Sequence, residues 1–152
     1  TLDIVMHFKN NIKDTIHASI NTITQLSSKL RTRQSLFDRT GGLHAVGLFD
    51  REGNYITSRE DVGRHNAMDK VIGWAVQQNR LPLTESIVLV SGRASFELVQ
   101  KALAAQIPIF CAVSAPSSLA IDLAHRFDMT LIGFLRDDNF NIYTMPSRII
   151  SQ

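Results

Sequence analysis

Short apolar runs alternate with longer amphipathic stretches along most of the chain. Residues 87–90, 109–113 and 130–135 are nearly continuous apolar runs rich in Ile, Val and Leu. Such runs are typical of central strands that are covered on both faces. Between them, residues 94–105 and 117–127 carry apolar side chains at helical spacing. The alternation predicts parallel strands joined by helices, that is, a three-layer α/β/α fold with a mixed sheet.

A hairpin is expected before this region. Residues 45–50 and 55–58 predict two strands, and the segment Arg-Glu-Gly-Asn at 51–54 predicts the turn between them. A helix is expected from about His65 to Gln78, because its apolar side chains form one stripe. Residues 141–144 predict the last strand.

The N-terminal part is more polar. A helix is expected over residues 21–35, with Asn21 or Thr22 as its N-cap. Its apolar face consists of Ile23, Leu26 and Leu30. Residues 4–8 predict a strand before it.

Thr40-Gly41-Gly42 breaks the pattern. The sequence therefore predicts an N-terminal segment, residues 1–39, which is a linker or the remainder of a preceding domain. A ligand-binding domain is expected over residues 40–152.

Composition narrows the class of protein. The chain has 152 residues, of which 44% are hydrophobic and 20% charged, enough to build a core. A net charge of +2 with dispersed basic residues does not favour nucleic-acid binding. No apolar run approaches the ~20 residues of a membrane helix, so no membrane association is expected. Cys111 is the only cysteine, which excludes an internal disulfide and favours a reduced, cytoplasmic setting.

The densest polar motif is Glu-Asp-Val-Gly-Arg-His-Asn-Ala-Met-Asp-Lys at residues 60–70. It stands where a strand meets a helix, and helix N-termini favour anions. Arg64 could clamp a phosphate or carboxylate after the turn at Gly63, and His65 could exchange a proton with its ring oriented by Asp69, four residues on. The alternative is a plain helix start with exposed, weakly paired charges.

A second motif, Ser-Gly-Arg-Ala-Ser, occupies residues 91–95 directly after an apolar run. Open α/β sheets bind ligands outside the carboxyl ends of their strands, where this segment is expected. Gly92 would let the backbone approach a ligand, Ser91 and Ser95 would supply hydroxyls, and Arg93 a cation. The alternative is an ordinary strand-to-helix loop with a serine cap.

Three further features are open to simpler interpretations. Ser-Ala-Pro-Ser-Ser at 114–118 is explained by helix capping. Cys111 lies within an apolar run and is expected to be a buried, unreactive thiol. Residues 134–139, Phe-Leu-Arg-Asp-Asp-Asn, could stack on and hydrogen-bond a base, but a polar hairpin turn explains them as well.

Five segments, in this order and spacing, together resemble the formate dehydrogenase accessory protein family (FdhD/NarQ). They are residues 40–45 (Thr-Gly-Gly-Leu-His-Ala), 60–70, 91–97 (Ser-Gly-Arg-Ala-Ser-Phe-Glu), 112–116 (Ala-Val-Ser-Ala-Pro) and 131–134 (Leu-Ile-Gly-Phe). The resemblance extends from about residue 40 to the C-terminus.

The resemblance implies a cytidine deaminase-like fold and a function. Members are cytoplasmic, typically dimeric sulfur carriers required for formate dehydrogenase activity. They pass persulfide sulfur from a cysteine desulfurase to a molybdenum bis(molybdopterin guanine dinucleotide) cofactor, which is bound as cargo. The family's cofactor segment corresponds here to Phe134, Leu135, Arg136, Asp137, Asp138 and Asn139. With the residues of the two corners, Gly63, Arg64, His65, Ser91, Gly92 and Arg93, these are the expected cofactor contacts.

Two departures limit what the resemblance implies. The family's sulfur-carrying Cys-x-x-Cys pair is missing, and Cys111 does not occupy its place. The zinc signature of deaminases is also missing, because Asn66 and Ala67 follow His65 and no cysteines stand at 91–93. No zinc and no catalytic residue are therefore expected, and whether the chain is an enzyme, as a sulfurtransferase-type carrier, is left open.

Two rival functions remain from the sequence. The first is a non-catalytic module that docks the desulfurase or the apo-dehydrogenase without touching the cofactor. The second is a nucleotide-processing enzyme on a deaminase-like scaffold, for which neither a nucleophile nor a metal site is visible.

Overall fold

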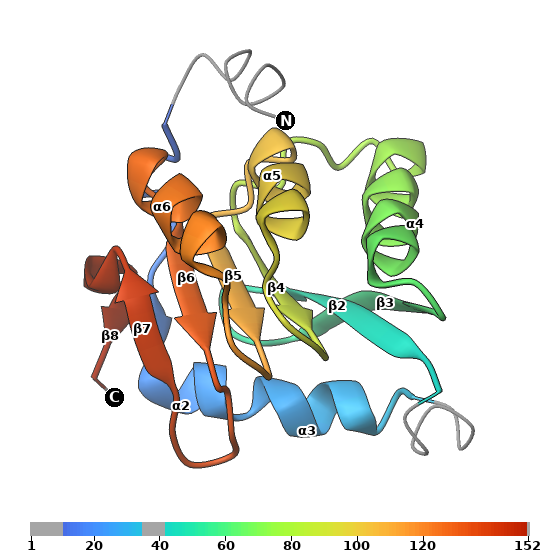
Figure 1. Cartoon of the computed structure of the whole chain (residues 1–152), viewed down its shortest axis with the longest axis horizontal. Coiled ribbons are helices and arrows are strands. Elements are labelled where there is room, and N and C mark those ends of the chain that lie inside the picture. The colour runs from blue at the N-terminus through green and yellow to red at the C-terminus, as the bar shows by residue number, and fades with distance from the viewer. Residues whose placement is uncertain (1–10, 35–41, 152) are drawn as a thin grey trace.

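The computed structural model describes residues 11–34 and 42–151, and these form a six-stranded mixed sheet with helices on both faces (Figure 1). The strands are Ala18–Ser19 (β1), His44–Asp50 (β2), Tyr55–Asp61 (β3), Ser86–Val90 (β4), Ile109–Ala112 (β5), Thr130–Gly133 (β6), Asn141–Thr144 (β7) and Ile149–Ile150 (β8). The helices are Ile20–Thr24 (α2), Leu26–Arg31 (α3), Arg64–Gln77 (α4), Phe96–Ala104 (α5) and Ser118–Arg126 (α6), followed by the 3₁₀ turn Pro146–Arg148 (η2). The three-layer α/β/α fold expected from the sequence is confirmed.

The strand order is β3-β2-β4-β5-β6-β7. β4, β5 and β6 are parallel, whereas β2 runs antiparallel to both β3 and β4, and β7 antiparallel to β6. As a result, the carboxyl ends of β3, β4, β5 and β6 and the amino end of β2 all meet at one edge of the sheet. We call this edge the carboxyl edge.

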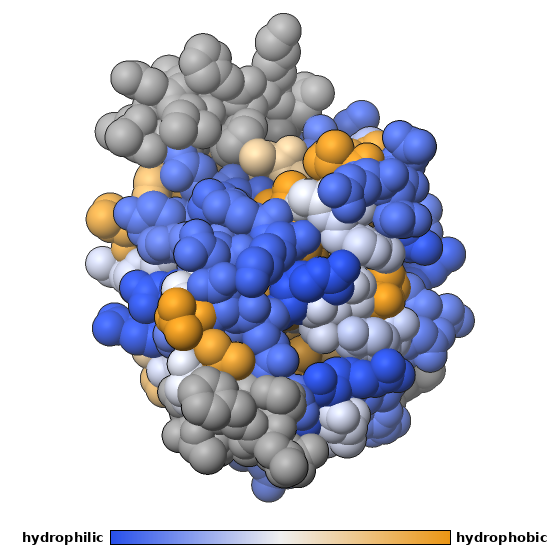
Figure 2. Space-filling model, turned by 90° about the vertical axis from the view of Figure 1, so that its right-hand side faces the viewer, coloured by the Kyte–Doolittle hydropathy of each residue, from blue (hydrophilic) through white to orange (hydrophobic). Residues whose placement is uncertain are grey.

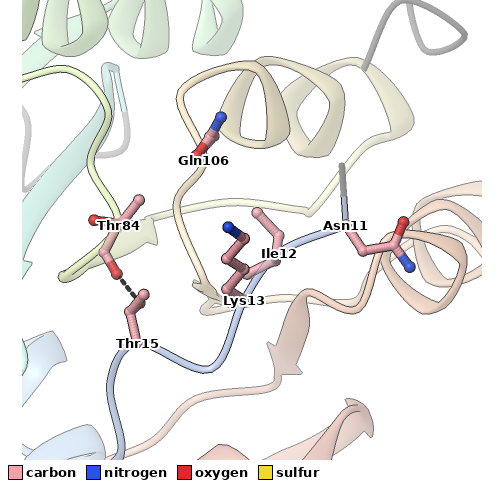
Figure 3. Close-up of a pocket in the computed structure, with 6 residues that line it drawn as sticks. All are labelled: Asn11, Ile12, Lys13, Thr15, Thr84 and Gln106. Atoms are coloured by element: carbon pink, nitrogen blue, oxygen red, sulfur yellow. Dashed lines mark hydrogen bonds between the residues drawn. The ribbon is translucent and has the colours of Figure 1, made fainter. Parts of the chain in front are cut away.

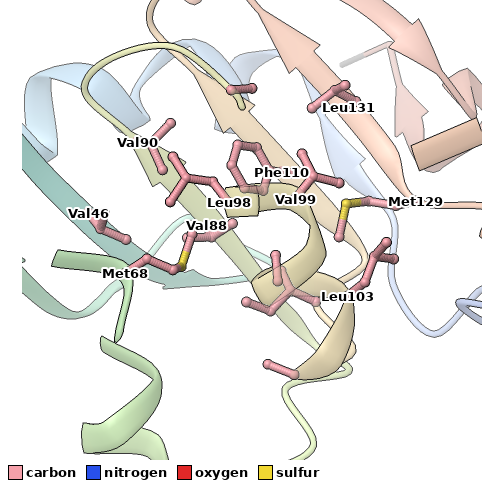
Figure 4. Packing of buried hydrophobic residues seen from close by; sticks show 14 of the residues in the cluster. Val46, Met68, Val88, Val90, Leu98, Val99, Leu103, Phe110, Met129 and Leu131 are labelled. Atoms are coloured by element: carbon pink, nitrogen blue, oxygen red, sulfur yellow. The ribbon is translucent and has the colours of Figure 1, made fainter. Parts of the chain in front are cut away.

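Two apolar cores flank the sheet, because successive strand residues point to opposite faces. On one face Val88 and Val90 pack beneath α4, α5 and α6, together with Phe110 and Leu131 (Figure 4). On the other face Ile87 and the strand residues that share its side pack against α2 and α3. No residue of either core is more than 8% exposed, and burial of one set of side chains on each face fixes the strand register.

The helix expected over residues 21–35 is two shorter helices, α2 and α3. Its N-cap is neither Asn21 nor Thr22 but Ser19, whose hydroxyl accepts a hydrogen bond from the backbone N–H of Thr22 at 3.0 Å. The helix is interrupted at Gln25, after a run of poor helix formers. The apolar face is confirmed, since Ile23, Leu26 and Leu30 are buried in the core beneath the sheet.

Residues 16–30 of the N-terminal segment thus contribute to the same core as the strands. The predicted boundary between residues 39 and 40, and the strand expected over 4–8, lie outside the described residues. No helix in the described part of the chain is long and apolar enough to cross a membrane.

Each of α4, α5 and α6 is followed by a residue in the left-handed conformation. These residues are Asn79, Gln106 and Asp128, with φ of 55°, 62° and 61°. The next backbone N–H returns to the helix in each case, for example from Ile107 to the carbonyl of Ala102 at 3.0 Å. Glycine usually takes this position, so the sequence carried no clear signal for these ends.

A buried arginine joins the two ends of the described chain, a feature that the sequence did not predict. Arg148 has no exposure; its guanidinium donates to the carbonyls of Ile12, Lys13 and Asp128 and lies 3.0 Å from the carboxylate of Asp14. β8 follows Arg148 directly in the chain and pairs with β1 in a short parallel sheet. This cluster holds the N-terminal segment against the C-terminal end.

Candidate functional site

Three loops at the carboxyl edge are hydrogen-bonded to one another. The N–H of Ser114, in the β5–α6 loop, donates to the carbonyl of Gly92 in the β4–α5 loop at 3.2 Å. The N–H of Phe134, after β6, donates in turn to the carbonyl of Ser114 at 3.1 Å. A bridge between Ala94 and Pro116 adds a second link. The sequence motifs that follow these strands therefore form one continuous surface.

The β4–α5 loop contains Ser91, Gly92 and Arg93. The hydroxyl oxygen of Ser91 accepts from the N–H of Ala45 at 2.9 Å, which leaves its proton for another acceptor. Gly92 is not in the left-handed region, and a Cβ there would lie an ordinary 3.6 Å from the His44 ring. The backbone conformation at this position therefore does not require a glycine. Arg93 is exposed and makes no ion pair or hydrogen bond within the described residues.

The β3–α4 corner contains the second motif. Gly63 is the N-cap of α4 and offers no side-chain cap, and no acidic residue lies in the first turn. The first amides of α4 therefore lack a side-chain partner. Arg64 is exposed and, like Arg93, unpaired in the part of the chain that the structure describes. The Nε2 atom of His65 is buried and has no hydrogen-bond partner within the described part of the chain.

Asp61 links β3 to α4 at this corner. Its carboxylate pairs with Lys70 at 2.7 Å and accepts from the N–H of Gly63 at 2.9 Å. The hydrogen bond from Lys70, followed by that from Gly63, lowers the pKa of Asp61 to about 2. The expected orientation of His65 by Asp69 is wrong, because Asp69 accepts instead from Lys101 at 2.7 Å.

The segment after β6 begins with a strained aromatic residue. Phe134 has φ of +52°, a conformation that bulky side chains rarely adopt, and the residue is 39% exposed. Leu135 lies in the core, so only its backbone could touch a ligand. The guanidinium of Arg136 donates to the carbonyl of Val113 at 2.6 Å and to its neighbour Leu135 at 3.0 Å, which ties this loop to the end of β5.

The remaining residues of that segment form the β6–β7 hairpin turn. The N–H of Arg136 donates to the carbonyl of Asn139 at 2.8 Å across the turn. Asp137 faces α3 and pairs with Arg31 at 3.2 Å, whereas Asp138 accepts from the side chain of Asn139. The three side chains are exposed. The simpler interpretation, a polar hairpin turn, correctly describes the backbone here.

Gly133 and Cys111 are both closely packed in the interior. A Cβ on Gly133 would lie 2.7 Å from Pro116 and 2.9 Å from Tyr143, so a glycine is needed for the β5–α6 loop to close over β6. Cys111 is fully buried, and burial raises the pKa of its thiol. The expectation of a buried thiol is confirmed. In α5 and α6, the N-caps Ser95 and Ser117 accept from backbone amides, as expected for caps.

A hollow of about 180 Å³ lies between α3 and the carboxyl ends of β4 and β5. We call it the α3 hollow; its lining residues are Ser27, Leu30, Arg31, Gln34, Ser91 and Val113. The contribution of α3 to this hollow was not predicted from the sequence, because a short amphipathic helix carries no motif. The only available signal was the polar Ser27 beside the apolar stripe.

A second hollow, of about 170 Å³, lies at the opposite edge of the sheet (Figure 3). It is lined by Asn11, Ile12, Lys13, Thr15, Thr84 and Gln106, with the Thr15 hydroxyl directed at the carbonyl of Thr84. None of the residues singled out from the sequence lines it. The candidate site is therefore the carboxyl edge.

The face that includes α4 and β3 is mainly hydrophilic, with isolated apolar residues (Figure 2). Among the described residues, no three His, Cys, Asp or Glu side chains are grouped so as to hold a metal ion. Among the described residues, the carboxyl edge offers two arginines without a partner, helix amides without a side-chain cap, hydroxyls and one exposed ring. These groups suit a ligand with phosphates and a planar ring.

Known proteins resemble this chain over most of its length. The sequence profile of the FdhD/NarQ family matches residues 3–150. The sulfur carrier protein FdhD of Mycolicibacterium paratuberculosis is 58% identical, covering 84% of this chain and 47% of that protein. The protein of the same name from Sulfolobus acidocaldarius is 49% identical, covering 91% of this chain and 54% of the other.

A crystal structure of a candidate formate dehydrogenase accessory protein from Desulfotalea psychrophila superimposes with a TM-score of 0.86 at 29% identity. The alignment covers 99% of this chain and 63% of that one. The chain spans about half the length of the curated relatives that it matches. The family match over nearly the whole chain and the high identity agree, and the chain belongs to the FdhD/NarQ family.

Proposed function

We propose that this chain is the part of a sulfur carrier that holds the molybdenum bis(molybdopterin guanine dinucleotide) cofactor as cargo before formate dehydrogenase receives it. The names of the relatives, sulfur carrier protein FdhD, support the sulfur-carrier role. The single observation that supports cofactor binding is that Arg64, Arg93 and the uncapped start of α4 lie at one edge, where neither arginine has a partner among the described residues.

The electrostatics of this edge favour a phosphorylated ligand. Arginine donates bidentately to phosphate oxygens, and free amides at a helix N-terminus add partial positive charge. In this proposal Arg93 and the amides of its loop hold one phosphate, and Arg64 with the start of α4 holds another. Phe134 stacks on a ring of the cargo. His65, whose Nε2 is buried and unpartnered, donates to or accepts from the same ligand.

The thiol chemistry belongs to residues other than Cys111. That side chain is fully buried, and burial raises the pKa of its thiol, so it is a poor nucleophile. A cysteine desulfurase would supply the sulfur in persulfide form to carrier cysteines that this sequence does not contain. The contribution of this chain is to bind and orient the cargo, and a homodimer is the expected assembly.

Calorimetry with GDP, the guanine nucleotide end of the cargo, tests the proposal. Arg93→Ala should weaken binding about 10- to 100-fold, the effect of one lost charge-assisted hydrogen bond. Arg64→Ala should act similarly, and raising the salt concentration should weaken the wild type. The matched control is Arg80→Ala, an exposed arginine that lies over Trp74 after α4. Wild-type affinity in both Arg64→Ala and Arg93→Ala would refute the proposal.

A second candidate function, docking of the desulfurase or the apo-dehydrogenase, is favoured by exposed apolar residues at the same edge. Val62 is 74% exposed and Leu119 61% exposed, each in or beside a loop of the carboxyl edge. Docking predicts capture of purified desulfurase or dehydrogenase that is lost in Leu119→Asp, with GDP affinity unchanged. Capture by the wild type without any GDP binding would favour docking over cofactor binding.

A further inference from the structure

Ser27 is an unexplained polar residue in the α3 hollow. It is 4% exposed and lies on the side of α3 that faces the sheet, and its Oγ has no hydrogen-bond partner among residues 11–34 and 42–151. Buried hydroxyls are almost always hydrogen-bonded, because an unsatisfied one loses its interactions with water without replacement. A hydroxyl that lines a hollow without a partner is therefore a donor and acceptor available to a ligand.

The other lining residues define what that ligand can be. Leu30 and Val113 supply apolar surfaces. Ser91 already accepts from the N–H of Ala45, so its hydroxyl proton can be donated to an acceptor in the hollow. At the rim, the guanidinium of Arg31 offers further donors. Apolar surfaces with a few directed polar groups are typical of sites for planar heterocycles.

The size of the hollow limits the ligand further. About 180 Å³ corresponds to roughly six water molecules at ~30 Å³ each, less than the ~300 Å³ or more of a site for a whole drug-sized ligand. One fused-ring base therefore fits, and a complete nucleotide does not. The phosphates would then lie outside the hollow, on the side of the β4–α5 loop, where Arg93 stands two residues after Ser91.

We propose that the α3 hollow binds one flat, fused-ring heterocycle of the cargo, through the hydroxyls of Ser27 and Ser91. The inference deepens the proposed function and rests on it. Guanine and pterin share the edge that the hydroxyls would meet, with one carbonyl acceptor and neighbouring N–H donors. The ion pair between Arg31 and Asp137 joins this hollow to the β6–β7 turn, so that the base and the turn lie on the same surface.

The test separates ring binding from phosphate binding. Calorimetry is run with GDP, with inorganic pyrophosphate and with 6-hydroxymethylpterin, on the wild type and on Ser27→Leu, which fills the hollow. We expect Ser27→Leu to weaken ring binding at least 10-fold and to leave pyrophosphate affinity unchanged. Ser27→Ala keeps the volume and should weaken ring binding about five-fold. Ser28→Leu, on the exposed side of α3, is the matched control.

The outcomes distinguish the two proposals. A loss of GDP affinity in Ser27→Leu assigns the hollow to the guanine, whereas a loss confined to the pterin compound assigns it to the pterin. Unchanged affinity for both rings in Ser27→Leu and Ser27→Ala overturns the inference, while Arg93→Ala can still weaken pyrophosphate binding and uphold the phosphate site. If Ser27→Leu fails to fold, the Ser27→Ala result decides alone.

Discussion

Phe134 combines a strained backbone with an exposed ring, so its substitutions should separate stability from binding. A residue other than glycine in the left-handed conformation costs about 1–2 kcal/mol. Glycine loses about 0.5–1 kcal/mol more backbone entropy on folding. The difference predicts that Phe134→Gly is more stable than Phe134→Ala by about 0.75 kcal/mol, the middle of a range that reaches about 1.5 kcal/mol.

Binding should respond differently, since both variants lack the ring. Stacking of a base on an aromatic side chain contributes about 1–3 kcal/mol, so Phe134→Gly and Phe134→Ala should both bind GDP about five-fold to a hundred-fold more weakly. Phe134→Trp keeps a stacking face and should keep most of the affinity. The more stable of the two small variants should therefore bind no better than the other.

Urea unfolding measures the stability of these variants, and calorimetry with GDP measures their binding. Ile142→Ala is the matched control, because Ile142 belongs to the same hairpin and is 37% exposed, close to the 39% of Phe134, but lies in an extended strand. Wild-type affinity in Phe134→Ala would show that the ring does not stack on the ligand. Equal stability of the Gly and Ala variants would refute the argument from backbone strain.

Three further predictions concern the framework of the site. Gly133→Ala forces a Cβ to within 2.7 Å of Pro116 and should destabilise the chain by about 1–3 kcal/mol in urea unfolding; an unchanged midpoint would contradict the close packing. Arg148→Met leaves buried carbonyls unpaired and should cost about 3 kcal/mol, with faster amide exchange over residues 12–16 as the local readout. The pKa of Asp61 is lowered, so the pairing of this carboxylate with Lys70 stabilises the fold above pH 3.8, and the stabilisation is lost as the pH falls towards 2. In Asp61→Asn, the free energy of unfolding in urea should depend less on pH between these two values.

Most strands and helices could be predicted because their signals are local. The apolar runs before Ser91 and Ser114 are too short and too β-branched for helices, and the flanking glycines, prolines and serines mark their ends. The C-terminal ends of the helices had no such local signal. Gln106 takes the left-handed position that glycine usually occupies, so the backbone there is decided by how α5 packs and not by the residue type.

The candidate site was predicted in part. Topology alone requires that loops after parallel strands share an edge, which is why Arg93 could be placed near the segment after β6. Which side chains form ion pairs with one another could not be predicted in the same way. Asp69 lies four residues after His65, the spacing of a helical pair, yet it binds Lys101 on α5, since the packing of two helices brings that cation closer.

The sequence by itself determined most of the strands and helices between residues 44 and 144, the burial of Cys111 and the family, because hydrophobic periodicity and a dense polar motif lie in neighbouring residues. Only the tertiary structure decided that α3 lies beside the carboxyl ends of β4 and β5, with its own residue Ser27 on the buried side. The same is true of Arg148, which joins both ends of the described chain. These contacts link residues that are far apart in the sequence. They depend on which surfaces pack together, and no local pattern records that choice.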